Sequence, residues 1–174
     1  NLAAGRQTAA ILGIETKKDR TLEKAPGASC SLLAFSSDGT VLAGAAGKEV
    51  HLWDVLSGKL RGRLAGHISD IQCLGFSADG RRLAVGTRSF PQVKLSAAGI
   101  PTTDYRFGEL RVWDLSSKRK EAAFRWALDN PGVAFSRDGK FFAGAGSNHF
   151  QGPGGGKVCV WEVGTWRELV TLEG

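Results

Sequence analysis

Few side chains in this sequence carry groups that could do chemistry. The 174 residues include three His and three Cys, and the clearest chemical motif is the Gly-rich stretch at residues 152–157. It resembles a phosphate-binding loop, in which backbone N–H groups cradle a phosphate. The pattern fails twice, because Gln151 stands where the first Gly is required and Val158 where a Ser or Thr hydroxyl is required. We therefore predict no phosphate site there.

Other catalytic patterns are also missing from the sequence. It has no Gly-x-Ser-x-Gly, no Cys-x-x-Cys, and no His and carboxylate cluster at metal-ligand spacing. Three Cys are few and odd in number, so we expect buried thiols rather than a disulfide framework. We predict that the protein is not an enzyme, with no catalytic residue, no metal and no cofactor.

A repeated motif organises the chain instead. Phe-Ser-x-Asp-Gly begins at Phe35, Phe76 and Phe135, and each copy ends an apolar run. Asp-Gly suits a tight hairpin, because glycine readily adopts positive φ. We therefore assign structural roles to the six turn residues Asp38, Gly39, Asp79, Gly80, Asp138 and Gly139.

A second signature follows each hairpin, a short strand that ends in Trp and a carboxylate. The three Trp are Trp53, Trp113 and Trp161, which lie 18, 37 and 26 residues after the respective Phe. We predict that the Phe and Trp series are buried, because large aromatic side chains dominate protein cores. The position two residues before each Trp holds His51, Arg111 or Cys159, and this chemical variety predicts a semi-exposed position between repeats.

Together these motifs resemble the WD-repeat (WD40) propeller family, in which Phe-Ser-x-Asp-Gly, Trp-Asp and Leu-x-Gly-His occur in this order. The family's repeat is roughly 40–45 residues long, with four strands per blade. The resemblance covers nearly the whole chain and implies an all-β fold, an incomplete ring of four-stranded antiparallel blades. It also implies a structural His–Ser/Thr–Asp–Trp network at His67, to which Thr87 and Trp113 could contribute. No Asp stands at the usual spacing.

The motif spacing divides the chain into four parts. Residues 1–27 read as the last three strands of a degenerate blade, and residues 28–66 as a complete blade. Residues 67–127 form a blade with a long insertion at 88–107, and residues 128–174 a blade with a short Gly-rich insertion at 147–156. Since both insertions fall between a second and a third strand, we expect them on the same face of the propeller.

Insertions on one face of a repeat protein often mark its binding face. The resemblance implies a scaffold for protein–protein interaction, with partners of unknown identity. Aromatic and Arg side chains dominate interface energetics, so we predict partner-binding roles for residues of both insertions. They are Arg88, Phe90, Lys94, Tyr105, Arg106, Phe107, His149 and Phe150. Loop decoration without a partner is the competing interpretation.

Two other classes of function stay open. An enzyme or small-ligand binder would need polar residues converging on the propeller axis. The formal net charge of +6 allows an acidic partner, or less readily nucleic acid, on one face. The basic residues that would form that face are Lys59, Arg81, Arg82, Lys118, Arg119, Lys120, Arg137 and Lys140.

The ends of the chain predict a longer protein. The sequence has no Met, begins inside what reads as a strand, and stops at the Gly of a Leu-x-Gly. Propellers close with four to eight blades, so we expect the chain to be a fragment whose open blade edges could self-associate. No segment resembles a membrane span or a secretion signal, and we expect no membrane partner and a cytoplasmic location.

Overall fold

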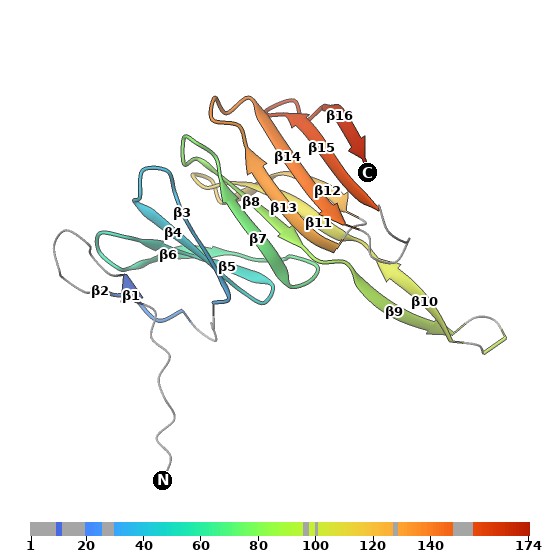
Figure 1. The fold of residues 1–174 in the computed structure, drawn as a ribbon. Helices are drawn as coiled ribbons and strands as arrows, with labels where there is room; N and C mark the ends of the chain where they lie inside the picture. Colours follow the sequence, from blue (N-terminus) through green and yellow to red (C-terminus); the bar gives the residue numbers. More distant parts are fainter. Residues whose placement is uncertain are drawn as a thin grey trace, which may run out of the picture.

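The computed structural model describes residues 10–11, 20–25, 30–95, 98–99, 101–126, 129–147 and 155–174. Within these ranges all regular structure is β-strand. Twelve strands form three four-stranded antiparallel sheets that stand side by side (Figure 1). The predicted all-β fold with four-stranded antiparallel blades is therefore confirmed.

Each sheet is a simple meander in chain order. Blade 1 contains β3 (Leu32–Phe35), β4 (Val41–Ala46), β5 (Glu49–Asp54) and β6 (Leu60–Leu64). Blade 2 contains β7 (Ile71–Phe76), β8 (Arg82–Thr87), β11 (Gly108–Asp114) and β12 (Arg119–Trp126). Blade 3 contains β13 (Asp129–Phe135), β14 (Phe141–Ser147), β15 (Gly156–Glu162) and β16 (Glu168–Glu173).

Two short two-stranded sheets lie outside the blades. β1 (Ala10–Ile11) pairs with β2 (Arg20–Thr21) before blade 1. Other parts of the predicted degenerate blade at residues 1–27 lie outside the described residues, so that boundary stays a prediction. β9 (Phe90–Leu95) pairs with β10 (Pro101–Arg106) along their full lengths, between β8 and β11.

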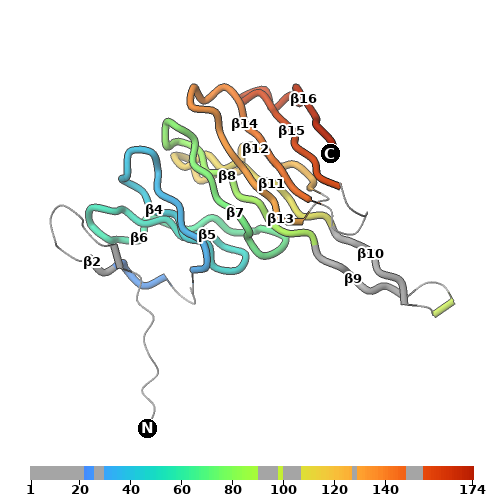
Figure 2. The backbone as a smooth tube through the Cα atoms, in the orientation of Figure 1, coloured from blue at the N-terminus to red at the C-terminus, as the bar shows by residue number. Residues whose placement is uncertain are grey.

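The Phe-Ser-x-Asp-Gly motifs build the same turn in every blade. In blade 1 the hydroxyl of Ser36 donates to Asp38 Oδ1 at 2.6 Å and accepts the N–H of Val41 at 2.9 Å. Gly39 has φ +69° and donates its N–H to the Ser36 carbonyl. Ser77 and Ser136 make the equivalent bonds in blades 2 and 3. These three turns lie on one side of the blade stack, which we call the turn face (Figure 2).

A second feature repeats at the outer edge of every blade. The register between the third and fourth strands shifts immediately before each Trp, at Leu52/Trp53, Val112/Trp113 and Val160/Trp161. Such a β-bulge increases local twist and re-aims the side chains around it. It therefore sets the orientation of each Trp, which for Trp113 and Trp161 is against the preceding blade.

The core lies between blades rather than within them. Leu52, Leu64 and Val85 form one buried cluster with Trp113, at the contact of blades 1 and 2. A second cluster joins blades 2 and 3. The members of the second cluster are Ala84, Leu110, Val112, Trp126, Phe142, Cys159 and Trp161.

The predicted burial of the aromatic series is right for all three Trp, only partly right for Phe76 and Phe135, which are half-buried, and wrong for Phe35. Trp53, Trp113 and Trp161 are at most 8% exposed, whereas Phe35 is 53% exposed. Phe35 shares a face of blade 1 with Leu42, its direct cross-strand partner. That face packs against the short segment 22–25 rather than against a described blade. The repeat motif alone could not distinguish this end blade from an internal one.

Candidate protein interaction surfaces

His67 forms hydrogen bonds to two blades. Its ring is 5% exposed, between β6 and β7. Trp113 Nε1 of blade 2 donates to His67 Nε2 at 3.1 Å, and His67 Nδ1 lies 3.0 Å from the Lys48 carbonyl of blade 1. Since Nε2 accepts, Nδ1 carries the proton and donates to that carbonyl. His67 thus connects the β4–β5 turn to the Trp of the next blade.

Thr87, the other expected partner of His67, bonds elsewhere. Its hydroxyl accepts the N–H of Glu109 at 2.9 Å across the β8–β11 ladder. Trp113 therefore reaches the His67 ring directly, without a hydroxyl in between.

Burial of His67 makes the stability of the fold sensitive to acid. Desolvation is the main cause that lowers the pKa of His67 below 6.5, and the nearby Arg111 adds to it. The unfolded chain therefore takes up a proton more readily, so stability falls as pH drops below 6.5, by up to about 1.4 kcal/mol per pH unit. We predict that His67→Gln, whose amide can both accept and donate, loses less free energy of unfolding than the wild type between pH 7 and pH 5.

Urea unfolding at both pH values measures this difference. The two proteins share every carboxylate, so acid effects from Asp and Glu cancel in the comparison. An equal loss of free energy of unfolding in the two proteins would contradict the conclusion that buried His67 makes the fold sensitive to acid.

The position two residues before each Trp is buried, contrary to the semi-exposed position predicted. His51 is 3% exposed, Arg111 9% and Cys159 1%. The reason is that these side chains share the contact between blades with the Trp. Arg111 tolerates burial because it bonds Glu109 at 2.8 Å and the Gly66 carbonyl at 3.0 Å. Periodicity alone did not reveal this ion pair, although Glu109 and Arg111 lie two apart on one strand and so share a face.

The long insertion forms a β-hairpin, a regular element that its loop-like position did not predict. Strand-forming residues lie on both sides of Gly99, which has φ +72°; they are Phe90, Val93, Thr102, Thr103 and Tyr105. This signal could have identified the hairpin from sequence. In Figure 1 the hairpin extends away from the blades on the side opposite the turn face, which we call the insertion face.

The predicted partner-binding residues fall into three groups. Arg88 is half-exposed at the base of the hairpin, where its Nη2 lies 3.5 Å from Asp70 Oδ2. Phe107, at the other base, is 46% exposed, and the Arg125 guanidinium lies 5.4 Å from its ring centroid. Four of the predicted residues lie in the hairpin strands, and their side chains are not among those described. They are Phe90 and Lys94 in β9 and Tyr105 and Arg106 in β10. His149 and Phe150 lie outside the described residues.

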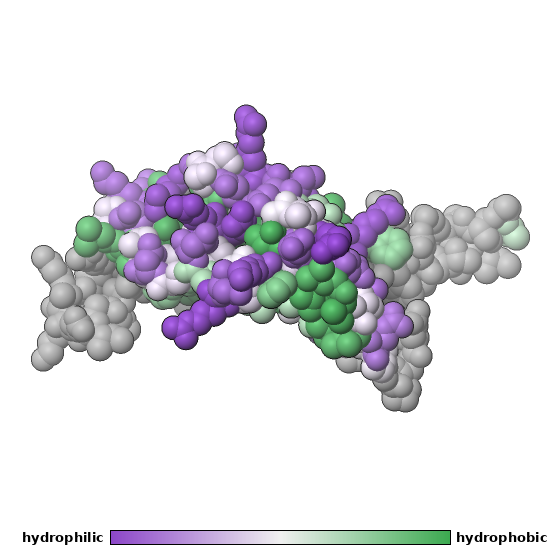
Figure 3. All heavy atoms as spheres, turned by 90° about the horizontal axis from the view of Figure 1, so that it is seen from above, coloured by the Kyte–Doolittle hydropathy of each residue, from purple (hydrophilic) through white to green (hydrophobic). Residues whose placement is uncertain are grey.

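Basic side chains gather at one place on the turn face. A groove of about 430 Å³ between blades 1 and 2 is lined by Arg61, Arg81 and Lys118. Lys118 Nζ donates to the Arg61 carbonyl at 2.7 Å, which joins the two blades. Hydrophilic residues dominate this side in Figure 3. Arg82 faces a different partner, since its guanidinium forms two hydrogen bonds with Glu121.

The remaining candidates for chemistry among the described residues are the Cys73 thiol and possible metal ligands. Burial raises the pKa of the Cys73 thiol to about 11. Within the described ranges no group of His, Cys, Asp or Glu is arranged to hold a metal ion. No helix among the described residues is long and apolar enough to cross a membrane.

Three four-stranded antiparallel blades that stack through their Trp-bearing faces define the WD40 type of β-propeller. Residues 20–54 and 58–89 match the WD40 family (WD domain, G-beta repeat). The second match ends directly before the β9–β10 hairpin, which separates it from its Trp-Asp strand.

Two known proteins illustrate the likeness. Protein ROOT INITIATION DEFECTIVE 3 of Arabidopsis thaliana is 29% identical over 101 residues, which are 58% of this chain and 19% of that protein. The crystal structure of RRP9 WD40 repeats aligns with a TM-score of 0.64 at 23% identity, over 87% of this chain and 40% of that one. The chain therefore spans about a fifth of the first protein and two fifths of the second.

Proposed function

We propose that the protein is a non-catalytic scaffold that binds another protein through its insertion face. The observation that carries this proposal is the β9–β10 hairpin, whose strands pair with each other and, among the described strands, with no blade. An isolated two-stranded hairpin is only marginally stable in water. A partner that packs against it would supply the missing contacts, while the stacked blades hold its base in place.

The base of the hairpin adds exposed groups suited to an interface. Phe107 is 46% exposed and Ile68 is 45% exposed, and the Arg88 side chain lies on the same face. Aromatic and Arg side chains are frequent hot spots of protein interfaces. The buried His67 and the high-pKa Cys73 are engaged in packing, which favours binding over catalysis.

Site-specific photo-crosslinking tests the proposal. A photoreactive amino acid at position 107 is expected to capture a partner that the same group at position 56 does not capture. Leu56 is the control because it is 77% exposed and lies in a turn on the turn face. The identified partner is then purified, and its affinity is measured for the wild type and for a variant in which a short Gly-Ser linker replaces residues 90–106.

We expect the shortened variant to bind at least about tenfold more weakly, a loss of about 1.4 kcal/mol, with an unchanged unfolding midpoint. Equal capture from positions 56 and 107, or unchanged affinity, would refute the proposal. A cytoplasmic location, and self-association through blade edges, stay predictions.

The groove on the turn face favours a second candidate, an acidic protein partner. Arg61, Arg81 and Lys118 converge there from two blades, with Asp38 as the acidic member of the lining. Binding at this groove would weaken steeply with added salt, and Arg81→Gln would reduce it. Nucleic acid is the less favoured ligand of the same groove.

A further inference from the structure

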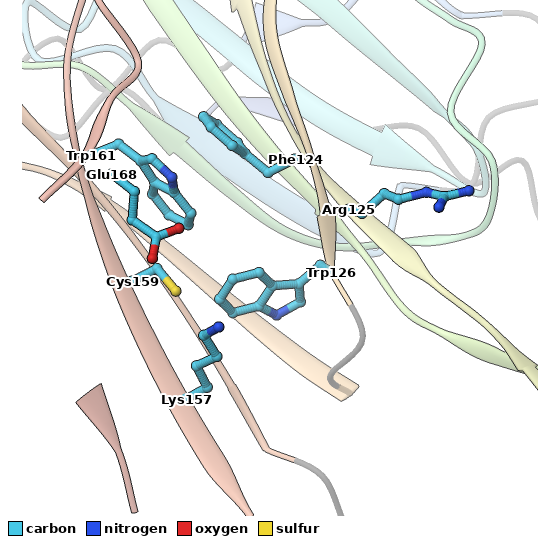
Figure 4. Close-up of a pocket in the computed structure, with 7 residues that line it drawn as sticks. All are labelled: Phe124, Arg125, Trp126, Lys157, Cys159, Trp161 and Glu168. Carbon is cyan, nitrogen blue, oxygen red and sulfur yellow. The ribbon is translucent and has the colours of Figure 1, made fainter. Parts of the chain in front are cut away.

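A separate pocket opens at the outer rim, between blades 2 and 3. It measures about 320 Å³ and lies between β12 on one side and β15 and β16 on the other (Figure 4). Three aromatic rings form its apolar wall: Phe124 stacks on Trp161 at 4.4 Å between ring centroids, and Trp126 meets Trp161 edge-on at 6.1 Å. Lys157, Cys159 and Glu168 supply its polar groups.

The repeat explains why this pocket is open. At the contact of blades 1 and 2, the positions four and two residues before Trp113 hold Glu109 and Arg111, whose side chains fill the space as a buried ion pair. At the contact of blades 2 and 3, the same positions before Trp161 hold Lys157 and Cys159. The long Arg is thus replaced by a short Cys, and the negative Glu by a positive Lys.

Two hydrogen-bond donors of the pocket have no partner among the described residues. The indole Nε1 of Trp126 is buried without an acceptor, in a residue that is only 4% exposed. The Lys157 ammonium forms no ion pair or hydrogen bond within the described part of the chain. In Figure 4 the Trp126 nitrogen lies on the ring edge toward Lys157. A buried N–H without an acceptor is costly, about 1–3 kcal/mol.

The Glu168 carboxylate of the pocket already accepts one hydrogen bond. Glu168 Oε1 accepts the hydroxyl of Thr171 at 2.5 Å, and Thr171 Oγ1 also lies 3.2 Å from Cys159 Sγ. In Figure 4 the Glu168 carboxylate lies near Cys159, on the other side of the pocket from Arg125, whose side chain points away from the other six residues. The unpaired donors of Trp126 and Lys157 therefore call for an anion.

We infer that this rim pocket binds an acidic side chain of a peptide, next to an aromatic or aliphatic residue of the same peptide. The carboxylate accepts from Trp126 Nε1 and pairs with the Lys157 ammonium, and the apolar neighbour packs on the rings of Phe124, Trp126 and Trp161. The volume is at the lower end for ligand pockets and fits two side chains rather than a large ligand. This inference does not depend on the hairpin, which contributes no residue to the pocket.

Nuclear magnetic resonance of the indole N–H groups tests the pocket directly. The sequence has five Trp, so the ¹H–¹⁵N spectrum contains few indole signals, and Trp126→Phe identifies the Trp126 signal by its loss. The probes are the capped dipeptides acetyl-Phe-Glu-amide and acetyl-Phe-Gln-amide, and free 3-phenylpropionate. We expect the Glu dipeptide to shift the Trp126 signal and the Gln dipeptide to leave it in place.

Charge variants complete the test. Lys157→Gln is expected to weaken binding of the Glu dipeptide by about tenfold, equivalent to about 1.4 kcal/mol. Arg167→Gln, which removes a positive charge from an exposed turn of the same blade, is expected to leave binding unchanged. The inference would be overturned if both dipeptides shifted the Trp126 signal equally, or if Lys157→Gln did not weaken binding. Binding of 3-phenylpropionate but of neither dipeptide would also overturn it.

Discussion

Replacing Trp113 by Ala is expected to lower the free energy of unfolding by about 3–5 kcal/mol, the usual cost of removing a buried aromatic side chain. The ring is 8% exposed and packs in the cluster that joins blades 1 and 2. Its loss also leaves His67 Nε2 without the donor that it has in the wild type. Urea unfolding, followed by the fluorescence of the remaining tryptophans, measures the effect.

Phe35→Ala is the matched control for this substitution. It also truncates a large aromatic residue of a repeated motif, but Phe35 is 53% exposed on the end blade. We expect it to cost no more than about 1 kcal/mol, since surface substitutions rarely cost more. Similar losses in the two variants would contradict the conclusion that the core lies between the blades.

This pair of substitutions also shows what the sequence could and could not predict. Blades are built from local signals: an Asp-Gly turn, an alternating strand and a Trp at fixed spacing can all be recognised within one repeat. The environment of a repeated residue depends on the neighbouring blade, which lies tens of residues away in sequence. Phe35 and Phe76 have the same local motif, and only Phe76 packs against an inter-blade cluster.

The candidate sites follow the same division. The position of the long insertion was predicted from the interval between Phe76 and Trp113. Its hairpin structure was not predicted, although strand-forming residues on both sides of Gly99 indicate it. The rim pocket could not be predicted in this way. It depends on Cys159 and Lys157 in one blade and on Trp126 in another, and none of these residues forms a motif by itself. Aligning the blades on their Trp residues would have shown that Lys157 replaces Glu109.

The charged residues of the turns, unlike the packed aromatic residues, depend on contacts within their own turn. The five acidic residues Asp38, Asp54, Asp79, Asp114 and Asp138 all have a lowered pKa, and in each case hydrogen bonds from turn Ser residues or backbone N–H groups are the main cause. For Asp114 the pKa is about 2, chiefly because Ser116 and Ser117 donate to it. These carboxylates therefore stay ionised while they hold the turns. The Asp-Gly pairs identified Asp38, Asp79 and Asp138 as turn residues from the sequence, whereas Asp54 and Asp114 stood out there only as the carboxylate that follows a Trp.

Gly108→Ala is expected to be the most damaging single-methyl addition in blade 2. Gly108 begins β11 directly after the hairpin, and a Cβ at this position would collide with the backbone oxygen of Thr87 and lie 2.9 Å from the carbonyl carbon of Arg88. Backbone atoms of a paired strand cannot rotate away as a side chain can. We predict a loss of about 2–3 kcal/mol in the free energy of unfolding, which is typical of a methyl group forced into filled space.

Gly132→Ala provides the comparison, because it adds the same methyl group to a strand of blade 3. The nearest atom to its Cβ would be the Cβ of Ala145 at 3.9 Å, an ordinary contact. Removing a glycine there restricts the unfolded chain, so we expect no loss and a gain of up to about 1 kcal/mol. Opposite signs for the two variants in urea unfolding would show that close approach of β8 and β11 fixes the base of the hairpin. Equal effects would mean that strand propensity alone accounts for both glycines.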